Sequence, residues 1–405
     1  MLGSVPPTSL TGDPSCPPAI GEPTAPMALP ALRAVRRPFE TIEPAAWDAL
    51  VDANPWSTPF SRWAVHRAWW DAYGANAHEE TIVVIPADAR PDATPIGIVP
   101  LMHRHEVEAG DMELRTTIRH QDGPALTPVA PDAKAVFFGA SYHADYATLL
   151  AAPADLPAVA DAVADYLAHG GDPSHPHPWD AVDLRRLRCG DEAADALAAA
   201  FGRREADCGW TMNVEQEDVC PVVTLPAGAS IDDYLTTLGK KERHEIRRKV
   251  RRAEAAGELA LTDSQDPLAD LPAFIDLHQK RWGADGLFPP NPGGDQSRTF
   301  VRRMFELMGA DGPLRLAFLT VGDRRIAAGL TFESPTGILY YNAGVDPYAR
   351  ELSAGVLMVE RYIRRAIERG IPRFDLLRGD EAYKYEWGAV DEPIQRVLVR
   401  RTEGR

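Results

Sequence analysis

The stretch "ILYYNAGVDPYARELSAGVLMVERYIRRAIERG", from Ile338 to Gly370, decides the fold. It begins as a β-rich run, passes through a short loop with Asp and Pro, and continues as an amphipathic pattern. Apolar residues at helical spacing between Val356 and Ala366 form one face, and arginines occupy the other. Gly370 and Pro372 end the pattern. The sequence therefore predicts a strand, a loop and a helix in direct succession.

The start of this helix has the residue types of an anion site. Arg350, Ser353 and Gly355 fit the pattern R-x-x-S-x-G. A helix N-terminus presents unpaired N–H groups and the positive end of the dipole, so it suits a pyrophosphate. The structural alternative is that Ser353 is only an N-cap and Gly355 only a packing residue. The residues predicted to bind a phosphate-bearing cofactor here are Val345, Arg350, Ser353, Ala354 and Gly355.

The rest of the second half surrounds this unit. The runs "LRLAFLTV", "RIAAGLTFE" and "ILYYNAGV" are separated by turns, which predicts an antiparallel meander. Further strands are expected at 374–377 and 394–401. Three helices are expected before the meander: one continuous helix from a Ser230 N-cap to Gly257, then 267–283 and 297–312.

The first half mixes strands and helices. Helices are expected at 44–51, 61–74 and 155–170, and strands at 81–87, 96–103 and 179–187. Residues 1–30 contain eight prolines and few large apolar residues, which is typical of a disordered tail. We therefore predict a tail (1–30), an N-terminal domain (31–205) and a C-terminal domain (206–405). Two halves of similar length and mixed class also fit an old duplication.

The composition limits the function classes. The chain has 405 residues and a formal charge of -16, which argues against general binding of nucleic acids or anionic membranes. The four cysteines show no metal-finger or CxxC spacing and are expected to be reduced thiols. No apolar run has the length of a membrane span, and the N-terminus lacks the pattern of a signal peptide. A cytoplasmic location is expected.

A basic run from Lys240 to Arg252 contrasts with this acidic total, because it holds eight Lys or Arg. One interpretation is a solvated helix with i,i+4 ion pairs such as Glu245–Lys249. The other is an anion site for a phosphate-bearing cofactor, an anionic substrate or RNA. Arg247 and Arg251 are the substrate-binding candidates of this run.

The segment "FDLLRGDEAYKYEWGA", from Phe374 to Ala389, places Lys384 between two tyrosines. A partly desolvated lysine can stabilise an oxyanion or hold a carbonyl or phosphate group. Asp380 and Glu381 are candidate bases, and Tyr383 is a candidate proton donor. The alternative is a surface pair between Lys384 and Glu381 or Glu386, with the aromatic rings in the core.

Metal binding is not expected. His103 and His105, and likewise His175 and His177, have H-x-H spacing, but no carboxylate cluster accompanies them. The sequence also lacks a G-x-S-x-G elbow, a Walker loop and a GxGxxG motif.

The order meander, helix, strand resembles the second half of a Gcn5-related N-acetyltransferase (GNAT) core. The segments "YLTTLGKKERHEIRRKVRRAEAAG", "FIDLHQKRWG" and "GDEAYKYEWG" resemble the FemAB-like branch, which includes acetyltransferases associated with cellulose and exopolysaccharide biosynthesis. "NPWSTPFSRWAVHRAWWDAYG" and "IGIVPLMHR" resemble the first half of the same proteins. Ser353 stands where the usual Q/R-x-x-G-x-G/A loop has glycine.

The resemblance implies an α/β (α+β) fold of two tandem GNAT-like domains. Each would have a mixed, mostly antiparallel sheet flanked by helices, and the second would hold the acyl donor. Lys384 would lie at the end of the strand after the phosphate-binding helix, near the reaction centre. The implied catalytic residues are Asp380, Tyr383, Lys384 and Tyr341.

The resemblance also implies an activity. The chain would transfer an acyl group from acyl-CoA, without a metal, to an amine or hydroxyl of a cell-envelope or exopolysaccharide precursor. Residues expected to contact the substrate are Arg247, Arg251, Trp282, Asn342 and Arg378. One alternative is a FemAB-type peptidyltransferase that uses aminoacyl-tRNA, the only case in which nucleic acid would bind. Another is a non-catalytic scaffold in polysaccharide biosynthesis.

Overall fold

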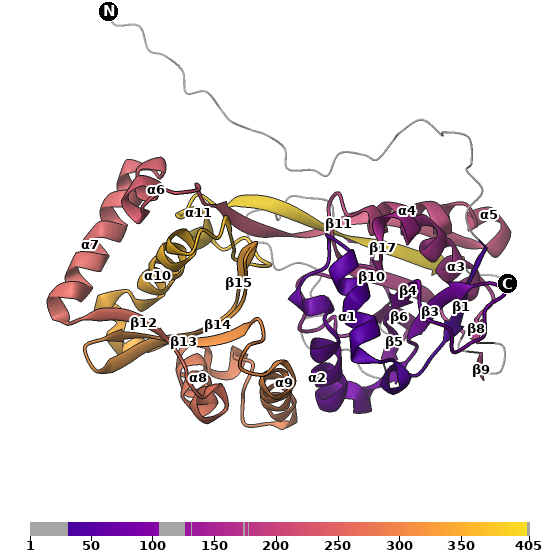
Figure 1. Cartoon of the computed structure of the whole chain (residues 1–405), viewed down its shortest axis with the longest axis horizontal. Helices are drawn as coiled ribbons and strands as arrows, with labels where there is room; N and C mark the ends of the chain where they lie inside the picture. Colours follow the sequence, from indigo (N-terminus) through magenta and orange to yellow (C-terminus); the bar gives the residue numbers. More distant parts are fainter. Residues whose placement is uncertain (1–30, 105–125, 131, 173–174, 177, 403–405) are drawn as a thin grey trace, which may run out of the picture.

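The computed structural model describes residues 31–104, 126–130, 132–172, 175–176 and 178–402, so the predicted tail lies outside the described residues. Two mixed lobes are joined by a long ribbon of two strands (Figure 1). The strands of the first half are β1 (Leu32–Arg36), β2 (Ala77–Glu79), β3 (Ile82–Pro86), β4 (Gly97–Val99), β5 (Leu101–Arg104), β6 (Ala135–Phe138), β7 (Leu150–Ala151), β8 (Gly171–Asp172), β9 (His175–Pro176), β10 (Ala181–Arg188) and β11 (Trp210–Thr224). Its α-helices are α1 (Pro44–Ala53), α2 (Trp63–Tyr73), α3 (Leu156–Ala168), α4 (Glu192–Gly202) and α5 (Glu205–Cys208).

The second half contains the elements that build the site. Its α-helices are α6 (Ile231–Thr237), α7 (Lys240–Ala256), α8 (Pro267–Trp282), α9 (Pro292–Met308), α10 (Ala354–Glu368) and α11 (Ala382–Tyr385). Its strands are β12 (Leu259–Asp263), β13 (Leu314–Val321), β14 (Arg324–Ser334), β15 (Gly337–Val345), β16 (Arg373–Asp375) and β17 (Val390–Arg401). The predicted meander is confirmed, since β13, β14 and β15 pair antiparallel in that order.

The two halves repeat one order of elements. Each contains a strand followed by two helices (β1, α1, α2 and β12, α8, α9), then several strands, a helix, a strand, a helix and a long last strand; α6 and α7 precede this order in the second half, and β8, β9 and α5 are additions in the first. In the first half this order ends with α3, β10, α4 and β11, and in the second with α10, β16, α11 and β17. The fold class is therefore the expected one, two tandem GNAT-like units with mixed, mostly antiparallel sheets, and the repeat fits a duplication.

The last strands join the halves into one sheet. The order of the eleven-stranded sheet is β12-β13-β14-β15-β16-β11-β17-β10-β6-β5-β2. The last strand of each half is thus inserted beside a strand of the other half: β11 pairs with β16, and β17 pairs with β10. β11 and β17 pair antiparallel from Trp210↔Arg401 to Val222↔Val390. Because this ladder is continuous, the halves are not independent of each other.

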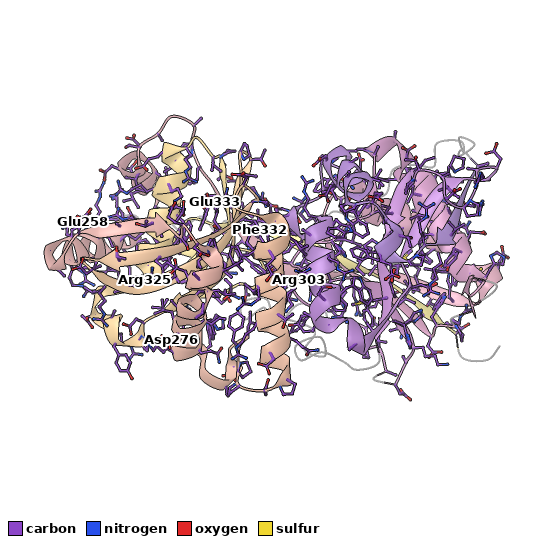
Figure 2. The ribbon with its side chains drawn as sticks, turned by 60° about the horizontal axis from the view of Figure 1, so that its bottom comes forward. Glu258, Asp276, Arg303, Arg325, Phe332 and Glu333 are labelled. Carbon is purple, nitrogen blue, oxygen red and sulfur yellow. The ribbon has the colours of Figure 1, made fainter. Side chains whose placement is uncertain are left out.

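Two helices also join the halves, and the region where the two halves meet is called the junction. α2 of the first half packs against α9 of the second, and their residues share one hydrophobic core. Tyr73 Oη lies 3.0 Å from Ser297 Oγ, and Arg303 Nε donates to Asp71 at 2.7 Å. Arg303 lies at the border of the two lobes in Figure 2. The junction is therefore both apolar and ion-paired.

Two expectations about elements are wrong. The predicted helix 230–257 is broken into α6 and α7 at Leu238 and Gly239, although the Ser230 N-cap is confirmed as a capping box with Asp233. The predicted strand 96–103 is split at Pro100, and its two parts enter different sheets. A proline cannot donate to a ladder, which accounts for the second break.

The cysteine prediction is confirmed only in part. Cys208 and Cys220 are free thiols, but Cys189 is disulfide-bonded, so the expectation of four reduced thiols is wrong for that residue. Among the described residues, no helix combines the length and the apolar character that crossing a membrane requires.

The carboxylate of Asp191, the N-cap residue of α4, lowers the free energy of unfolding at neutral pH. This carboxylate accepts from Ala193 N at 2.8 Å, the residue is 1% exposed, and burial raises its pKa to about 6. The folded state therefore favours the protonated acid. Stability is lost as pH rises from the unfolded value near 3.8 through 6, and the cost at neutral pH is about 3 kcal/mol.

We expect Asp191→Asn, which keeps a capping oxygen without the charge, to raise the free energy of unfolding at pH 7.5 by about 1–3 kcal/mol. Below pH 4 the variant and the native chain should be equally stable. Urea unfolding at both pH values measures this. Asp191→Ala is the control, because it also removes the cap and should gain less. Equal losses in both variants at pH 7.5 would contradict the argument.

Candidate active site

The site begins where two parallel strands separate. β15 and β16 pair only at Ile338↔Phe374 and Leu339↔Asp375. After Asp375 the chain turns toward β11 instead, and Leu376 N donates to Pro221 O at 3.0 Å. Within the described chain, no strand pairs with this edge of β15 from Tyr340 to its end. The unpaired edge offers backbone N–H and C=O groups to a ligand.

A β-bulge interrupts β15 at its two tyrosines. Leu330 of β14 lies opposite Asn342, but the next residue, Thr331, lies opposite Tyr340, so Tyr341 is the extra residue. Tyr340 packs on Tyr362, with ring centroids 5.5 Å apart, on the side of α10. The extra residue shifts the register of β15 against β14 by one residue at this point.

Tyr341 points into the junction with the first half. Its ring centroid lies 5.4 Å from that of Phe60, and its hydroxyl donates to the carbonyl of His143 at 3.1 Å. Burial, with Asp145 nearby, raises the pKa of Tyr341 well above its usual value. The structure thus places this predicted proton donor on the opposite side of β15 from Tyr340.

The N-terminus of α10 forms the second part of the site. Ser353 has a left-handed backbone (φ 59°), and its side chain does not cap the helix. Instead Ser353 Oγ accepts from Arg252 Nη2 at 3.0 Å, and Arg252 Nε is buried with no hydrogen-bond partner among the described residues. A Cβ on Gly355 would meet no atom within 4 Å, so the space in front of this helix start is open. Arg350 is exposed just before it.

α7 delivers Arg252 and has a cationic outer surface. Arg247 pairs with Asp232 at 2.8 Å and Arg248 with Glu245 at 2.7 Å. Within the described chain, the other six cations of α7, Arg251 among them, have no ion pair. The expected i,i+4 pair Glu245–Lys249 is replaced by the i,i+3 pair Glu245–Arg248.

Lys384 is buried, 2% exposed, and lies in α11 rather than at the end of β16. Its ammonium donates to the carbonyls of Leu377 (2.9 Å), Arg378 (2.8 Å) and Gly379 (2.9 Å), and it pairs with Glu381 at 3.0 Å. An ammonium has three N–H donors, and all three are used. Its position at the strand end is therefore a wrong expectation, and its observed contacts hold a loop together.

Tyr383 of α11 lies near Tyr340 of β15, and the region of these two tyrosines is here called the mouth of the site. Tyr383 is 38% exposed, yet withdrawal from water and the neighbouring Glu381 raise its pKa to about 12. Burial and the nearby Tyr383 also raise the pKa of Tyr340, which was missed at the sequence level. Arg281, close enough to affect both hydroxyls, lies 4.7 Å from the ring centroid of Trp282, which is 45% exposed.

The remaining predicted residues occupy several places. Asp380 is fully buried, and Arg378 Nε lies 3.4 Å from Asp145 across the junction. Asn342 lies in β15, and Val345 packs against the core that α10 covers. The structure therefore gathers Val345 and the α10 start at one end and Tyr383 with Trp282 near the mouth, but it leaves Arg378 and Tyr341 at the junction.

No group of three or more metal-ligating side chains occurs in the part of the chain that is described. His105 and His177, one member of each H-x-H pair, lie outside it.

This geometry agrees with the comparisons to known proteins. Residues 240–385 match the family model described as "Acetyltransferase (GNAT) domain". The solved structure of FemX covers 87% of this chain and 96% of its own, with a TM-score of 0.54 and 10% identity. A conserved protein of unknown function from Bacteroides thetaiotaomicron VPI-5482 covers 89% and 98%, with a TM-score of 0.50 and 10% identity. No curated protein sequence matches.

The chain thus contains a GNAT acetyltransferase domain. As a whole it has the fold of FemX.

Proposed function

We propose that this protein is an acyltransferase that takes its acyl group from acyl-CoA and transfers it to an amine or hydroxyl. One observation carries the proposal: the unpaired edge of β15 leads to the open, cationic start of α10. An amide-containing arm can add to a free strand edge through backbone hydrogen bonds. The diphosphate at its end then meets the helix N-terminus, Arg252 and Arg350.

The chemistry follows from the groups at the mouth. The nitrogen or oxygen of the acceptor forms a bond to the carbonyl carbon while the carbon–sulfur bond breaks, and the acceptor loses a proton. Backbone N–H groups of the β15 edge stabilise the tetrahedral oxyanion. Because the pKa of Tyr383 is about 12, its hydroxyl stays protonated at neutral pH and can give a proton to the leaving thiolate. The proton that the acceptor loses then passes through water to Tyr383, which ends the reaction as it began. In this scheme Lys384 positions the loop that carries Tyr383.

The acceptor class rests on the resemblance to proteins of cell-envelope and exopolysaccharide synthesis. Trp282 and Tyr383 supply exposed aromatic surface at the mouth, and Arg281 supplies a cation. Such a combination suits a bulky polar precursor that carries negative charge.

Gly355 offers a test of the donor site. We expect Gly355→Asp to weaken acetyl-CoA binding at least tenfold, because its carboxylate would project into the open space and repel the diphosphate. The same carboxylate stabilises a helix N-terminus, so the fold should be unharmed. Calorimetric titration of the full-length chain measures the affinity. Gly355→Ala is the matched control and should bind like the native chain. Unchanged affinity in Gly355→Asp would place the donor elsewhere.

A second candidate donor is aminoacyl-tRNA, as in the FemAB enzymes that the chain resembles. The observation that favours it is the charge of α7, because six of its cations lack ion pairs among the described residues, and of these six only Arg252 forms a hydrogen bond with the start of α10 in that part of the chain. If this alternative holds, the folded native chain will bind tRNA but not acetyl-CoA. Replacing Arg247, Arg248 and Arg251 with Ala will then abolish tRNA binding. A chain that binds neither donor fits the scaffold role.

A further inference from the structure

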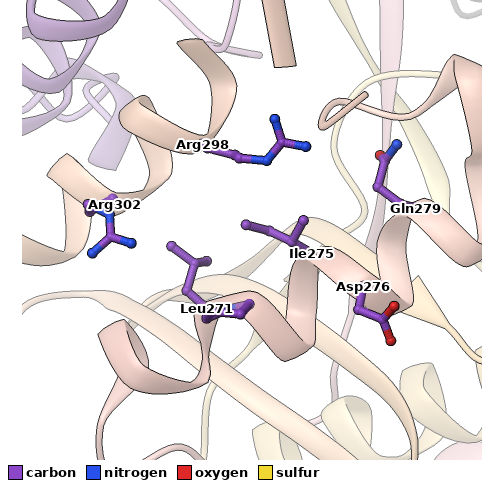
Figure 3. A pocket seen from close by; sticks show the side chains of 7 residues that line it. Leu271, Ile275, Asp276, Gln279, Arg298 and Arg302 are labelled. Carbon is purple, nitrogen blue, oxygen red and sulfur yellow. The ribbon is translucent and has the colours of Figure 1, made fainter. Parts of the chain in front are cut away.

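A cavity of about 420 Å³ lies between α8 and α9, on the face of the meander opposite to α10 (Figures 1 and 3). Leu271, Pro272 and Ile275 of α8 form its apolar floor. Two arginines of α9, Arg298 and Arg302, extend over this floor. Since the proposed donor site lies on the other face, this cavity is a separate feature.

The two arginines differ in what they bind. Arg298 is held by the protein: it donates to the carbonyls of Phe288 and Pro289 and pairs with Asp295 at 2.9 Å. Within the described chain, Arg302 has neither a hydrogen-bond acceptor nor an ion pair. One guanidinium is therefore structural, and the other is free to bind an anion.

The other polar side chains that line the cavity already have partners within the protein. Asp276 pairs with Lys280 at 2.6 Å. Gln279 accepts from Phe288 N and donates to Gly283 O, both at 3.0 Å. Both residues lie at the end of the cavity away from Arg302, whereas Leu271 lies beside Arg302 (Figure 3). The cavity thus has one cationic end and an apolar middle.

The shape favours an elongated ligand. The lining residues of α8 recur at helical spacing from Leu271 to Gln279, so the cavity follows the helix for roughly 12 Å. We propose that it binds an unbranched, medium-length acyl chain that ends in a carboxylate, with the carboxylate on Arg302 and the chain over Ile275. A carboxylate matches the fork of a guanidinium, and a long apolar chain matches the floor.

Titration of the full-length chain with decanoate tests this proposal by calorimetry, with decanol as the uncharged comparison. Decanoate should bind saturably and at least tenfold more tightly than decanol. Arg302→Gln should lower the decanoate affinity to that of decanol, and Ile275→Trp, which fills the cavity, should abolish binding of both. Lys134→Gln, which removes an exposed cation of the first half, should leave the affinity for decanoate unchanged.

Each opposite result counts against the site. If the native chain does not bind decanoate saturably, or binds decanol equally well, the anionic acyl ligand is wrong. If Arg302→Gln or Ile275→Trp binds decanoate like the native chain, the ligand binds elsewhere. Thermal unfolding of both variants establishes that they are folded. The result is independent of acetyl-CoA binding, so this proposal can fail while the proposed transferase function stands.

Discussion

Lys384→Ala is expected to destabilise the chain by about 3 kcal/mol, because backbone carbonyls that the loop withdraws from water lose a charged donor. Without the ammonium, the carbonyls of Leu377, Arg378 and Gly379 lose their shared donor. Leu377 and Gly379 have left-handed backbones (φ 57° and 101°), so this loop depends on those contacts. Urea unfolding of the full-length chain measures the loss.

Lys280→Ala is the matched control, because Lys280 is also a helical lysine paired with a nearby carboxylate. Its side chain is 44% exposed, and its loss should cost less than about 1 kcal/mol. Lys384→Arg should not rescue stability, since a planar guanidinium cannot direct its donors at three carbonyls as an ammonium does. If Lys384→Ala unfolds like the native chain and loses only kcat, then Lys384 is catalytic, as the sequence predicted.

The backbone contacts of Lys384 could not be predicted from the sequence. Its place between Tyr383 and Tyr385 left a partly desolvated lysine and a surface ion pair both open; the structure shows a buried ammonium that pairs with Glu381. Its other partners are backbone carbonyls five to seven residues earlier, and their direction depends on the backbone of Leu377. That conformation is rare for a non-glycine residue, so no pattern in the sequence predicts it.

The strand, loop and helix of 338–370 could be predicted because their signals are local. The bulge at Tyr341 could not, because one inserted residue shifts the register of β15 against β14 without a local signal in the sequence. Tyr341 was named as a catalytic residue from the resemblance alone, and its neighbour Tyr340 was not named.

Other errors have tertiary causes. The apolar stripe of the predicted helix 230–257 includes Leu238, but the structure draws Leu238 into the core beside Gly388 and breaks the helix there. β11 was missed because its first half is polar and Pro221 lies within it. Its stability comes from β17, at the far end of the chain, which no local window contains.

Acid is expected to destabilise the chain steeply below pH 6.5. Burial lowers the pKa of His66 and His143 to about 3, so both are neutral when folded and gain a proton near 6.5 when unfolded. The stability they contribute is complete above pH 6.5 and is lost as pH falls toward 3. Each adds a slope of about 1.4 kcal/mol per pH unit, or about 2.7 together. Urea unfolding between pH 5 and 7.5 measures it.

His143 lies at the junction of the two halves, so a substitution there tests whether the junction contributes to the pH dependence of stability. The Nε2 of His143 lies 2.7 Å from Tyr73 Oη, and its ring stacks on Phe300 with centroids 4.3 Å apart. His143→Gln cannot take up that proton, so the slope should fall by about 1.4 kcal/mol per pH unit, whatever the variant loses in absolute stability. His169→Gln, at a side chain 73% exposed, should leave the slope unchanged. Asp191 acts in the opposite direction between pH 3.8 and 6 but is present in every variant, so it cancels from the comparison. An unchanged slope in His143→Gln would mean that water reaches this histidine and that the junction opens before the chain unfolds.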